Sequence, residues 1–286
     1  MHCIINTEIV PVENAVIGIS DLALQRGYGI FDFFKTVNGR PVFIEAHLDR
    51  FYRSAATMRL GPPLNREQLT NKILDLLALN RIESSGIKIT LTGGYSADGF
   101  TPGNPNLIVV QTAMPPVNQF QHQGIRLITH GHKRQLPSVK STDYLMAVYL
   151  QPLIKEKDAQ DVLYYADGYI TECPRANIFI VTKQKQILTP AHNVLHGVIR
   201  SRILEMQLPY PVSEADISLQ DLYEAEEVFI TSTTKNVLPV TAVDGHVIGN
   251  GDAGPITGML WQQLETLIEA DISSAHSLLK ATHNQN

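Results

Sequence analysis

Lys140 is the residue of this sequence best placed for chemistry. It stands in the mostly uncharged stretch Pro137-Ser138-Val139-Lys140-Ser141, just ahead of a helix that we predict to begin near Thr142. The positive end of a helix dipole disfavours an ammonium ion, so a lysine in this position can become a nucleophilic amine. The alternative is an ordinary surface lysine, and this loop by itself favours that alternative.

Six short blocks of ionic, hydroxyl and small residues accompany this lysine along the chain. Two precede it and four follow it, and they are Arg26-Gly27-Tyr28-Gly29-Ile30-Phe31-Asp32, Glu45-Ala46-His47-Leu48-Asp49-Arg50, Asp167-Gly168-Tyr169-Ile170-Thr171-Glu172, Arg175-Ala176-Asn177-Ile178-Phe179, Thr231-Ser232-Thr233-Thr234 and Pro239-Val240. The chain has no P-loop, no Gly-x-Ser-x-Gly elbow and no His-Glu-x-x-His helix. The signal therefore lies in the order and spacing of the blocks.

In that order and spacing the chain resembles the fold-type IV pyridoxal-phosphate enzymes, the class IV aminotransferases. These include branched-chain and D-amino-acid aminotransferases and aminodeoxychorismate lyase, and the similarity extends from about Ser20 to Ala270. It implies an α+β fold with a small N-terminal α/β domain and a larger C-terminal pseudo-barrel domain. It also implies pyridoxal 5'-phosphate as the cofactor.

The resemblance gives Lys140 and Glu172 the catalytic roles. Lys140 would hold the cofactor as a Schiff base and then move the proton at the substrate Cα. Glu172 would lie against the pyridine nitrogen, where an anion keeps that nitrogen protonated and makes the ring an electron sink. The alternative for Glu172 is a solvent-facing carboxylate on a strand.

Cofactor phosphate is expected to meet a guanidinium and free backbone amides. Arg50 can bind phosphate through two parallel charge-assisted bonds, although it could instead form a surface ion pair with Asp49 or Glu45. Val198 and Ile199 open a predicted helix whose amides form an anion site, and Ile199 replaces the family's usual threonine. Ser232 and Thr233 could add hydroxyl or amide contacts.

Substrate contacts are expected from aromatic and hydroxyl side chains. Tyr28 and Phe31 are candidates for the wall of the substrate site, and Thr233 and Thr234 for contacts with a substrate carboxylate. Tyr144 follows Lys140 by four residues, about one helical turn, and so could face the same site. Asp32 replaces the family's more usual glutamate, and His47 is expected to be structural.

Transfer of an amino group between an amino acid and a 2-oxo acid is the activity that the resemblance implies. Leu91–Gly99 lacks the arginine with which D-amino-acid enzymes and the lyase hold carboxylates, which leaves branched-chain-like substrates as the best match. One alternative is a lyase that needs no 2-oxo acid. The other is a degenerate relative that binds an anion without catalysis.

Composition restricts the partners. A net charge of -5 and the lack of a long basic cluster argue against a nucleic acid, and no apolar stretch is long enough to span a membrane. The two cysteines are far apart and have no neighbours at metal-ligand spacing, which favours a reducing, cytoplasmic location and no metal. The family resemblance implies a homodimer.

Periodicity and turn residues predict the elements that position these groups. A hairpin turns at Asn38-Gly39, helices follow at 47–58 and 66–79 with Asn65 as a cap, and strands at 86–92 and 106–113 complete an N-terminal domain of residues 1–115. A proline-rich linker covers 116–124. The second domain, 125–286, is expected to contain strands 125–129, 161–166, 169–173, 177–181, 227–231 and 237–243, helices from Thr142, Val198, Ser218 and Pro255, and a helix break at Pro152.

Overall fold

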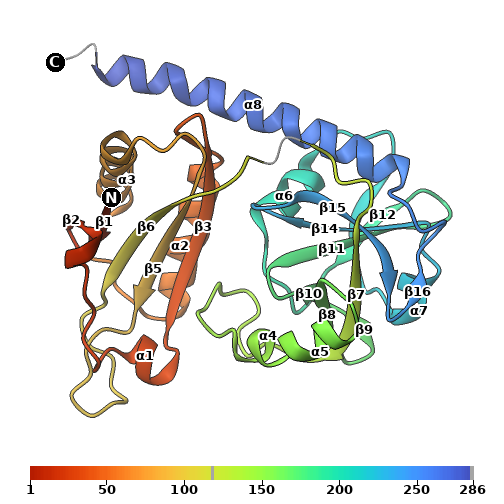
Figure 1. Cartoon of the computed structure of the whole chain (residues 1–286), viewed down its shortest axis with the longest axis horizontal. Coiled ribbons are helices and arrows are strands. Elements are labelled where there is room, and N and C mark those ends of the chain that lie inside the picture. Colours follow the sequence, from red (N-terminus) through yellow and green to blue (C-terminus); the bar gives the residue numbers. More distant parts are fainter. Residues whose placement is uncertain (117–118, 284–286) are drawn as a thin grey trace. The chain divides into compact units, whose positions relative to one another are not determined.

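The chain forms two compact units, each with its own sheet (Figure 1). A computed structural model describes residues 1–116 and 119–283. Unit 1 comprises 1–116, Val139–Asp143 and the part of the last helix that begins at Ile268, and unit 2 comprises 119–138 and Tyr144–Leu267. The expected α+β architecture is therefore present in both halves of the chain.

Unit 1 is built on a six-stranded sheet in the order β2-β1-β6-β5-β3-β4, in which every pairing is antiparallel. Its strands are β1 (His2–Ile5), β2 (Glu8–Pro11), β3 (Gly29–Val37), β4 (Arg40–Pro41), β5 (Ser85–Thr92) and β6 (Leu107–Ala113). Asn38 and Gly39 both have positive φ, at 52° and 70°, which confirms the predicted tight hairpin between β3 and β4.

The helices of unit 1 are η1 (Val12–Asn14), α1 (Leu22–Arg26), α2 (Ile44–Thr57) and α3 (Arg66–Asn80). Helices α2 and α3 bury apolar stripes in one core with the sheet, and Leu48, Phe51 and Leu69 are fully buried there. Asn65 caps α3 in a reciprocal capping box with Gln68, as predicted for that position. The sequence did not reveal β1, β2, η1 or α1, which are short.

Alternation along β3 separates two sets of side chains. Ile30 and Phe34 are fully buried in the core against α2, and Asp32 points to this same face. Phe31, Phe33 and Lys35 therefore point to the opposite face. This alternation places a carboxylate among the residues of α2 and an aromatic ring on the other side of the sheet.

The segment Val139–Asp143 extends the sheet of unit 1 beside the first half of β3. Lys140 accepts a hydrogen bond from the Phe31 amide at 2.9 Å, and the Thr142 amide donates to Gly29 at 3.0 Å. Val139 is 1% exposed and packs in the core of unit 1. The backbone around Lys140 is thus bonded to β3 at Lys140 and again at Thr142.

We predicted two domains, 1–115 and 125–286, and a domain is a part of the chain that can fold by itself. Compact units do not establish independent folding, so this division stays a prediction. The compact units differ from it at two places, because Val139–Asp143 and the residues from Ile268 group with unit 1. Val117 and Asn118 of the predicted linker lie outside the described residues.

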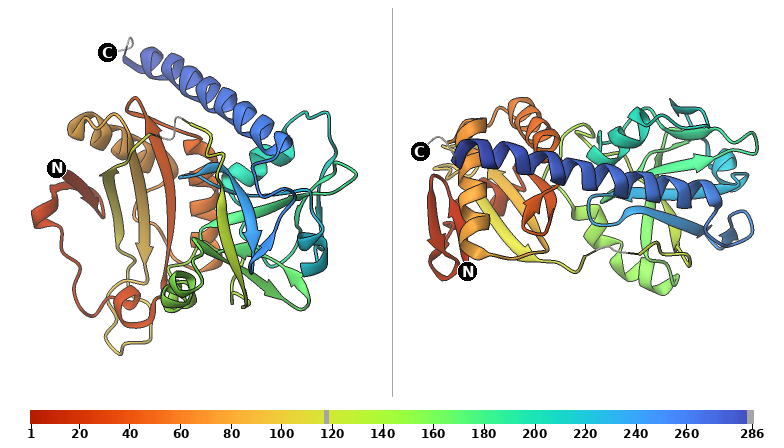
Figure 2. Two further views of the ribbon diagram at one scale, coloured as in Figure 1. Left: turned by 45° about the vertical axis from the view of Figure 1, so that its right-hand side comes forward. Right: turned by 90° about the horizontal axis from the view of Figure 1, so that it is seen from above.

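Unit 2 contains a ten-stranded sheet that curls rather than lying flat (Figure 2). Its main path is β13-β12-β11-β14-β15-β7-β8-β9, with β10 joined to β11 and β16 to β15. The strands are β7 (Ile125–Gly131), β8 (Asp161–Ala166), β9 (Tyr169–Ile170), β10 (Glu172–Cys173), β11 (Ala176–Val181), β12 (Ile187–Pro190), β13 (Val212–Ala215), β14 (Glu227–Ser232), β15 (Asn236–Val243) and β16 (His246–Val247). Its core is rich in Ile, Leu and Val from these strands.

Five helices belong wholly or partly to unit 2: α4 (Leu145–Tyr149), α5 (Gln151–Glu156), α6 (Val198–Glu205), α7 (Leu219–Tyr223) and the start of α8 (Pro255–His283). The helix predicted from Thr142 begins only at Leu145, because Ser141 and Thr142 bond to β3 instead. Pro152 lies in the first turn of α5, where its missing N–H costs nothing, and the chain breaks before it as predicted. Within residues 1–116 and 119–283, no helix combines the length and the apolar character needed to cross a membrane.

Candidate functional site

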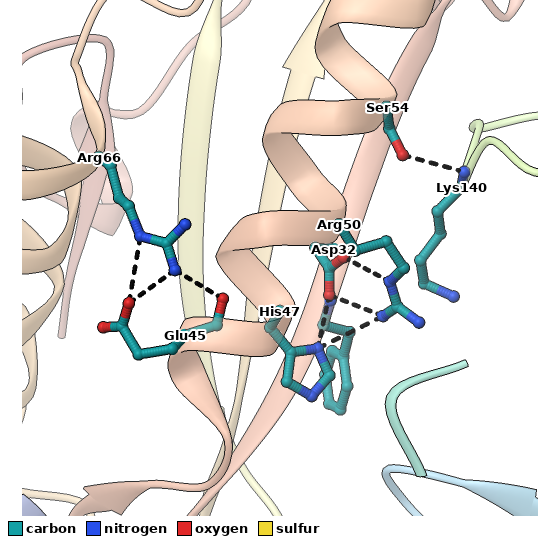
Figure 3. A network of polar contacts seen from close by, with 8 residues as sticks. Asp32, Glu45, His47, Arg50, Ser54, Arg66 and Lys140 are labelled. Carbon is teal, nitrogen blue, oxygen red and sulfur yellow. Dashed lines mark hydrogen bonds and ion pairs between the residues drawn. The ribbon is translucent and has the colours of Figure 1, made fainter. Parts of the chain in front are cut away.

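A polar stripe on α2 faces the sheet of unit 1 (Figure 3). His47, Arg50 and Ser54 are spaced three and four residues apart, so they share one side of the helix, and each is at most 5% exposed. Asp32, fully buried on β3, lies opposite them. Three polar groups on the buried face of a helix are unusual, so these residues are a candidate site.

Arg50 and Asp32 form a bidentate ion pair at the centre of this stripe. Arg50 Nε and Nη2 donate to the two Asp32 carboxylate oxygens, each at 2.8 Å. The Asp32 oxygens also accept the Phe33 amide and His47 Nδ1, both at 2.7 Å. Nη1 of Arg50 makes no hydrogen bond to any of the described residues, so two N–H groups of a rigidly held guanidinium stay available.

Electrostatics keeps Asp32 ionised. Burial alone raises the pKa of Asp32, but the Arg50 charge and the hydrogen bonds from Arg50 and His47 outweigh it and hold the pKa well below its usual range. Burial lowers the pKa of His47 from 6.5, Asp32 opposes that change, and the charges of Arg50 and Lys140 add to it. His47 is therefore the neutral imidazole near pH 7.

The network assigns the tautomer of His47. An ionised carboxylate only accepts hydrogen bonds, so Nδ1 must carry the imidazole hydrogen that bonds to Asp32. Arg50 Nη2 approaches the same nitrogen at 3.3 Å, and this is a packing contact because both atoms bear hydrogens. His47 supports Asp32 structurally, in keeping with the role expected for it.

We expect His47→Asn to reduce the loss of stability on acidification. A histidine whose pKa is lower in the folded state binds fewer protons there, so stability falls as pH falls below 6.5 toward the folded pKa. Between pH 7.5 and 5.5 the unfolding free energy of the wild type should therefore fall more than that of His47→Asn. Asparagine can still donate to Asp32 but does not titrate.

Urea unfolding at both pH values measures the difference, with His122→Asn as a control at a histidine outside unit 1. Equal pH dependence in wild type and His47→Asn would show that folding does not shift the pKa of His47. If the unfolding free energy depended less on pH in both His47→Asn and His122→Asn than in the wild type, the change could not be assigned to His47.

Lys140 lies beside this network. Its backbone amide approaches Ser54 Oγ at 3.5 Å (Figure 3). Its Nζ lies 4.6 Å from the centre of the Phe31 ring. The Lys140 charge contributes to the lowered pKa of His47, after burial and the charge of Arg50. Unit 1 therefore places the Lys140 amine at the Phe31 ring, and the Lys140 charge also acts on the polar stripe that contains Arg50.

The remaining predicted residues of the substrate site are placed differently. Tyr28 packs against the core of unit 1 and donates its phenol hydrogen to the Met58 carbonyl at 2.6 Å, so the hydroxyl is already occupied. Residues 140–144 are not helical, so Tyr144 does not stand one turn above Lys140, and the argument from spacing was wrong. Its role in the substrate site stays a prediction.

Arg50 does not form the surface ion pair that was its alternative. That pair belongs to Arg66, which donates to the Glu45 carboxylate at 2.6 Å and also contacts Asp49 (Figure 3). Both carboxylates lie on the exposed side of α2, whereas Arg50 is buried.

Glu172 of unit 2 is a buried carboxylate with three donors, and is 4% exposed. Arg134 Nη1 donates to Oε1 at 2.9 Å, while Asn177 Nδ2 and the Leu195 amide donate to Oε2 at 3.1 and 3.0 Å. These bonds fix the position of the carboxylate, and a carboxylate with an arginine partner is expected to be charged. The solvent-facing alternative for Glu172 was wrong.

Asn177 joins the other predicted groups of unit 2 to Glu172. Its Nδ2 also donates to the Leu195 carbonyl at 2.8 Å, and its register partner across β11 and β14 is Thr231, just before the Ser232 turn. A Cβ at Gly197 would lie 2.0 Å from Asn177 Oδ1. Only glycine therefore lets the start of α6 approach this amide.

The N-terminus of α6 offers backbone donors without a side-chain cap. Gly197 is the N-cap residue and has no side chain, so it provides no side-chain cap for the first amides of the helix. The side chains of Val198 and Ile199 are buried, at 6% and 3% exposure. Ile199 thus can offer only its backbone amide where the family usually has a threonine hydroxyl.

The predicted hydroxyl residues form the turn between β14 and β15. Ser232 Oγ lies 3.3 Å from Thr234 Oγ1 and accepts the Lys235 amide at 3.2 Å. Thr233 is half-buried and Thr234 is exposed. Ser232 is thus partly committed to holding the turn, whereas the two threonines present hydroxyls at its tip.

Two residues of this arrangement were not singled out from the sequence. Arg134 follows His132 and Lys133 in a short basic run that does not reveal its role, yet its side chain is only 17% exposed and pairs with Glu172. Asn177 had a detectable signal, because asparagine is disfavoured in strands and here interrupts the apolar run of β11. Across the described residues, no group of three or more His, Cys, Asp or Glu side chains is placed to hold a metal ion.

Comparisons with known proteins identify the family of this chain. The aminotransferase class IV family model matches residues 29–243. A D-alanine aminotransferase of Listeria monocytogenes is 32% identical over 94% of this chain and 97% of its own length. A putative branched-chain-amino-acid aminotransferase of Methanocaldococcus jannaschii is 29% identical over 93% of this chain and 96% of its own.

Solved structures of class IV aminotransferases have the same fold as this chain. The branched-chain amino acid aminotransferase of Escherichia coli superposes with a TM-score of 0.85, at 25% identity over 93% of this chain and 94% of its own. The T.th. branched-chain amino acid aminotransferase, solved with pyridoxamine 5'-phosphate, gives 0.86 at 25% identity over 95% and 94%. This chain belongs to the class IV aminotransferase family of pyridoxal-phosphate enzymes, and it has their fold.

Proposed function

We propose that this aminotransferase moves an amino group between a branched-chain-like amino acid and a 2-oxo acid, with Lys140 as the catalytic lysine. The observation that carries the proposal is the position of Lys140, whose amine lies 4.6 Å from the centre of the Phe31 ring. The Lys140 side chain is on the side of the buried Arg50 in Figure 3. When bound, pyridoxal phosphate supplies an aldehyde carbon that reacts with amines and a ring that withdraws electrons from the substrate Cα.

The donors in each unit fit the chemical groups of this cofactor. Within unit 1, Arg50 offers Nη1 to an anion such as phosphate. Within unit 2, the first amides of α6, at Val198 and Ile199, are donors of the kind that phosphate favours. Ser232 and Thr233 add hydroxyl or amide donors at the neighbouring turn. Phosphate is the anion that a planar guanidinium and a helix N-terminus both favour.

Glu172 fits the ring nitrogen. Its carboxylate is buried and oriented by Asn177 and Leu195, so it can hold a proton on a neighbouring nitrogen. Arg134 forms an ion pair with Glu172, and its positive charge weakens the attraction of the carboxylate for that proton. Lys140 Nζ would take the proton from the substrate Cα and return it in the second half of the reaction.

The absence of arginine from the Gly93–Asn106 loop favours branched-chain-like substrates over D-amino acids. Asp98 stands in this loop and binds its own neighbours, accepting the Phe100 and Thr101 amides at 2.9 and 2.7 Å. No arginine is present there to hold a substrate carboxylate. The T.th. branched-chain enzyme was also solved with 4-methylvaleric acid, a branched aliphatic acid. Thr233 and Thr234 are our candidates for the substrate carboxylate, and Tyr28, Phe31 and Tyr144 for the wall.

A homodimer and a cytoplasmic location complete the proposal. Unit 1 exposes Ile19, Leu24 and Phe100 by 70% or more, in segments that hydrogen-bond to one another through Leu22 and Gly94. Exposed apolar residues gathered in one region favour burial against a second copy. Sedimentation velocity should give twice the 31.7 kDa chain mass; a species of one chain mass would exclude the dimer. Both cysteines are free and buried, which suits a reducing compartment.

Amino transfer from L-leucine, D-alanine and L-glutamate to 2-oxo acids tests the function directly. We expect L-leucine to be at least tenfold more efficient than D-alanine, measured as kcat/KM from 2-oxo acid formed with pyridoxal phosphate present. Activity without an acceptor, with release of pyruvate or ammonia, would favour the lyase. No reaction with any amine, despite phosphate binding, would favour the degenerate relative.

A further inference from the structure

Lys235 ends the turn between β14 and β15, and its side chain reaches an acid on another strand. Its Nζ lies 3.6 Å from Oδ2 of Asp161, the first residue of β8. In the sheet, β7 stands between β15 and β8, so the strand ladder does not pair the turn with β8 directly. The ion pair is therefore a connection between the turn and β8 that the hydrogen bonds of the sheet do not supply.

The carboxylate of Asp161 is buried, and Lys235 compensates its charge. The side chain is 4% exposed, Oδ1 accepts the Val162 amide at 2.9 Å, and Oδ2 has no hydrogen-bond partner among the described residues. Burial raises the pKa of the Cys173 thiol well above its usual range, the Asp161 charge adds to this rise, and the Lys235 charge opposes it. The pair thus lies close to the residue that follows Glu172. A buried carboxylate without a counter-charge is costly, so Asp161 holds the Lys235 ammonium group in place.

Asn236 anchors the same turn to a second element. It is fully buried, and its Nδ2 donates to the carboxylate of Glu265 on α8. Its φ of 56° lies in the left-handed region, which asparagine adopts at a lower cost than most residues other than glycine. Two consecutive residues, Lys235 and Asn236, therefore connect the end of the turn to β8 and to α8.

We propose that Lys235 is a positioning residue, which acts through Asp161 to hold Thr233 toward the phosphate of the cofactor. The inference rests on the proposed function, because it takes the turn to supply donors to that phosphate. The ammonium group of Lys235 pairs with Asp161, so its contribution is the orientation of the turn. Hydrogen bonds depend on the direction of the donor, and a turn that is already ordered loses less conformational entropy when an anion binds.

Pyridoxamine 5'-phosphate and pyridoxamine test this role, because they differ only in the phosphate and neither forms a Schiff base with a lysine. Isothermal titration calorimetry on the full chain, freed of bound cofactor, measures both Kd values. In Lys235→Met the Kd of pyridoxamine 5'-phosphate should rise about tenfold or more, as for the loss of one charge-assisted hydrogen bond, and the Kd of pyridoxamine should not change. Lys235→Arg should recover most of the affinity, since a guanidinium also pairs with a carboxylate. Lys185→Met is the matched control, because Lys185 also lies in a turn of unit 2 and pairs with Glu226.

A double variant separates positioning from folding. Lys235→Met leaves the buried charge of Asp161 without its partner, so the Tm should fall. Lys235→Met combined with Asp161→Asn removes both charges, and asparagine can still accept the Val162 amide. Its Tm should recover while its affinity for pyridoxamine 5'-phosphate stays low. Recovery of both quantities would overturn the inference, because the single variant would then act only through stability.

These binding measurements are independent of amino transfer. A selective loss of affinity for pyridoxamine 5'-phosphate in Lys235→Met supports the inference even if no amino acid tested reacts. Equal Kd values in wild type and Lys235→Met, or equal losses for both ligands, reject it even if amino transfer is active. A wild type that binds both ligands equally well would show that no group of the turn holds the phosphate, and the inference would fail with it.

Discussion

Lys140→Ala should abolish amino transfer while leaving the fold intact. The alanine variant loses the amine that moves the proton at the substrate Cα, a contribution worth roughly a hundredfold to ten-thousandfold in rate, and it also loses the covalent attachment of the cofactor. The backbone bonds of residue 140 to Phe31 and Ser54 do not involve the side chain, so the segment stays on β3. Turnover with the preferred substrate and thermal unfolding measure the two effects.

Borohydride reduction identifies the attachment independently of turnover. In the wild type, reduction in the presence of pyridoxal phosphate should fix the cofactor on the peptide that contains Lys140, and mass spectrometry should find it there. Lys133→Ala, at a lysine whose charge is used in an exposed pair with Asp167, is the control. Retained amino transfer in Lys140→Ala, or label on another lysine, would remove the central assignment.

Glu172→Gln should retain cofactor binding and lower kcat by roughly a hundredfold to a thousandfold. The amide can still accept from Arg134, Asn177 or Leu195, so the local fold survives, but it cannot hold a proton on the ring nitrogen by charge. Arg134 then remains nearby without its anion and further disfavours a proton there. Single-turnover kinetics with the preferred amino acid measures the loss.

Two further variants give this prediction its controls. Glu172→Asp should recover part of the rate, since it restores the charge, and Glu156→Gln on the exposed surface of α5 should have no effect. Unchanged kinetics in Glu172→Gln would show that another group partners the ring nitrogen. Lost cofactor binding would show that Glu172 holds the cofactor instead of tuning it.

The fold could be predicted from the sequence wherever a local signal was strong. Asn38-Gly39 specified a hairpin because both residues adopt positive φ cheaply, and Asn65 specified a helix start because Gln68 completes its capping box. Helix α4 was placed three residues early. Nothing local shows that Ser141 and Thr142 bond to Ile30 and Gly29, more than a hundred residues away.

The candidate site was only partly predictable for the same reason. Lys140, Arg50 and Glu172 stand in blocks that resemble the family, so they could be named from sequence. Asp32 was noticed as an unusual residue, yet its pairing with Arg50 depends on how β3 faces α2. Arg134 and Asn177 were not assigned, because their partner Glu172 is brought to them by strand pairing in unit 2.

The place of Val139–Asp143 in unit 1 has a consequence for synthesis on the ribosome. When residue 116 leaves the exit tunnel, the Phe31 amide and the Gly29 carbonyl still lack the partners that Lys140 and Thr142 will provide. Val139 is likewise missing from the core at that moment. The nascent N-terminal unit is thus incomplete until Val139–Asp143 has been synthesised. These five residues pair with the edge of β3 and also contain the lysine. A chain released early has neither a finished sheet nor a reactive amine.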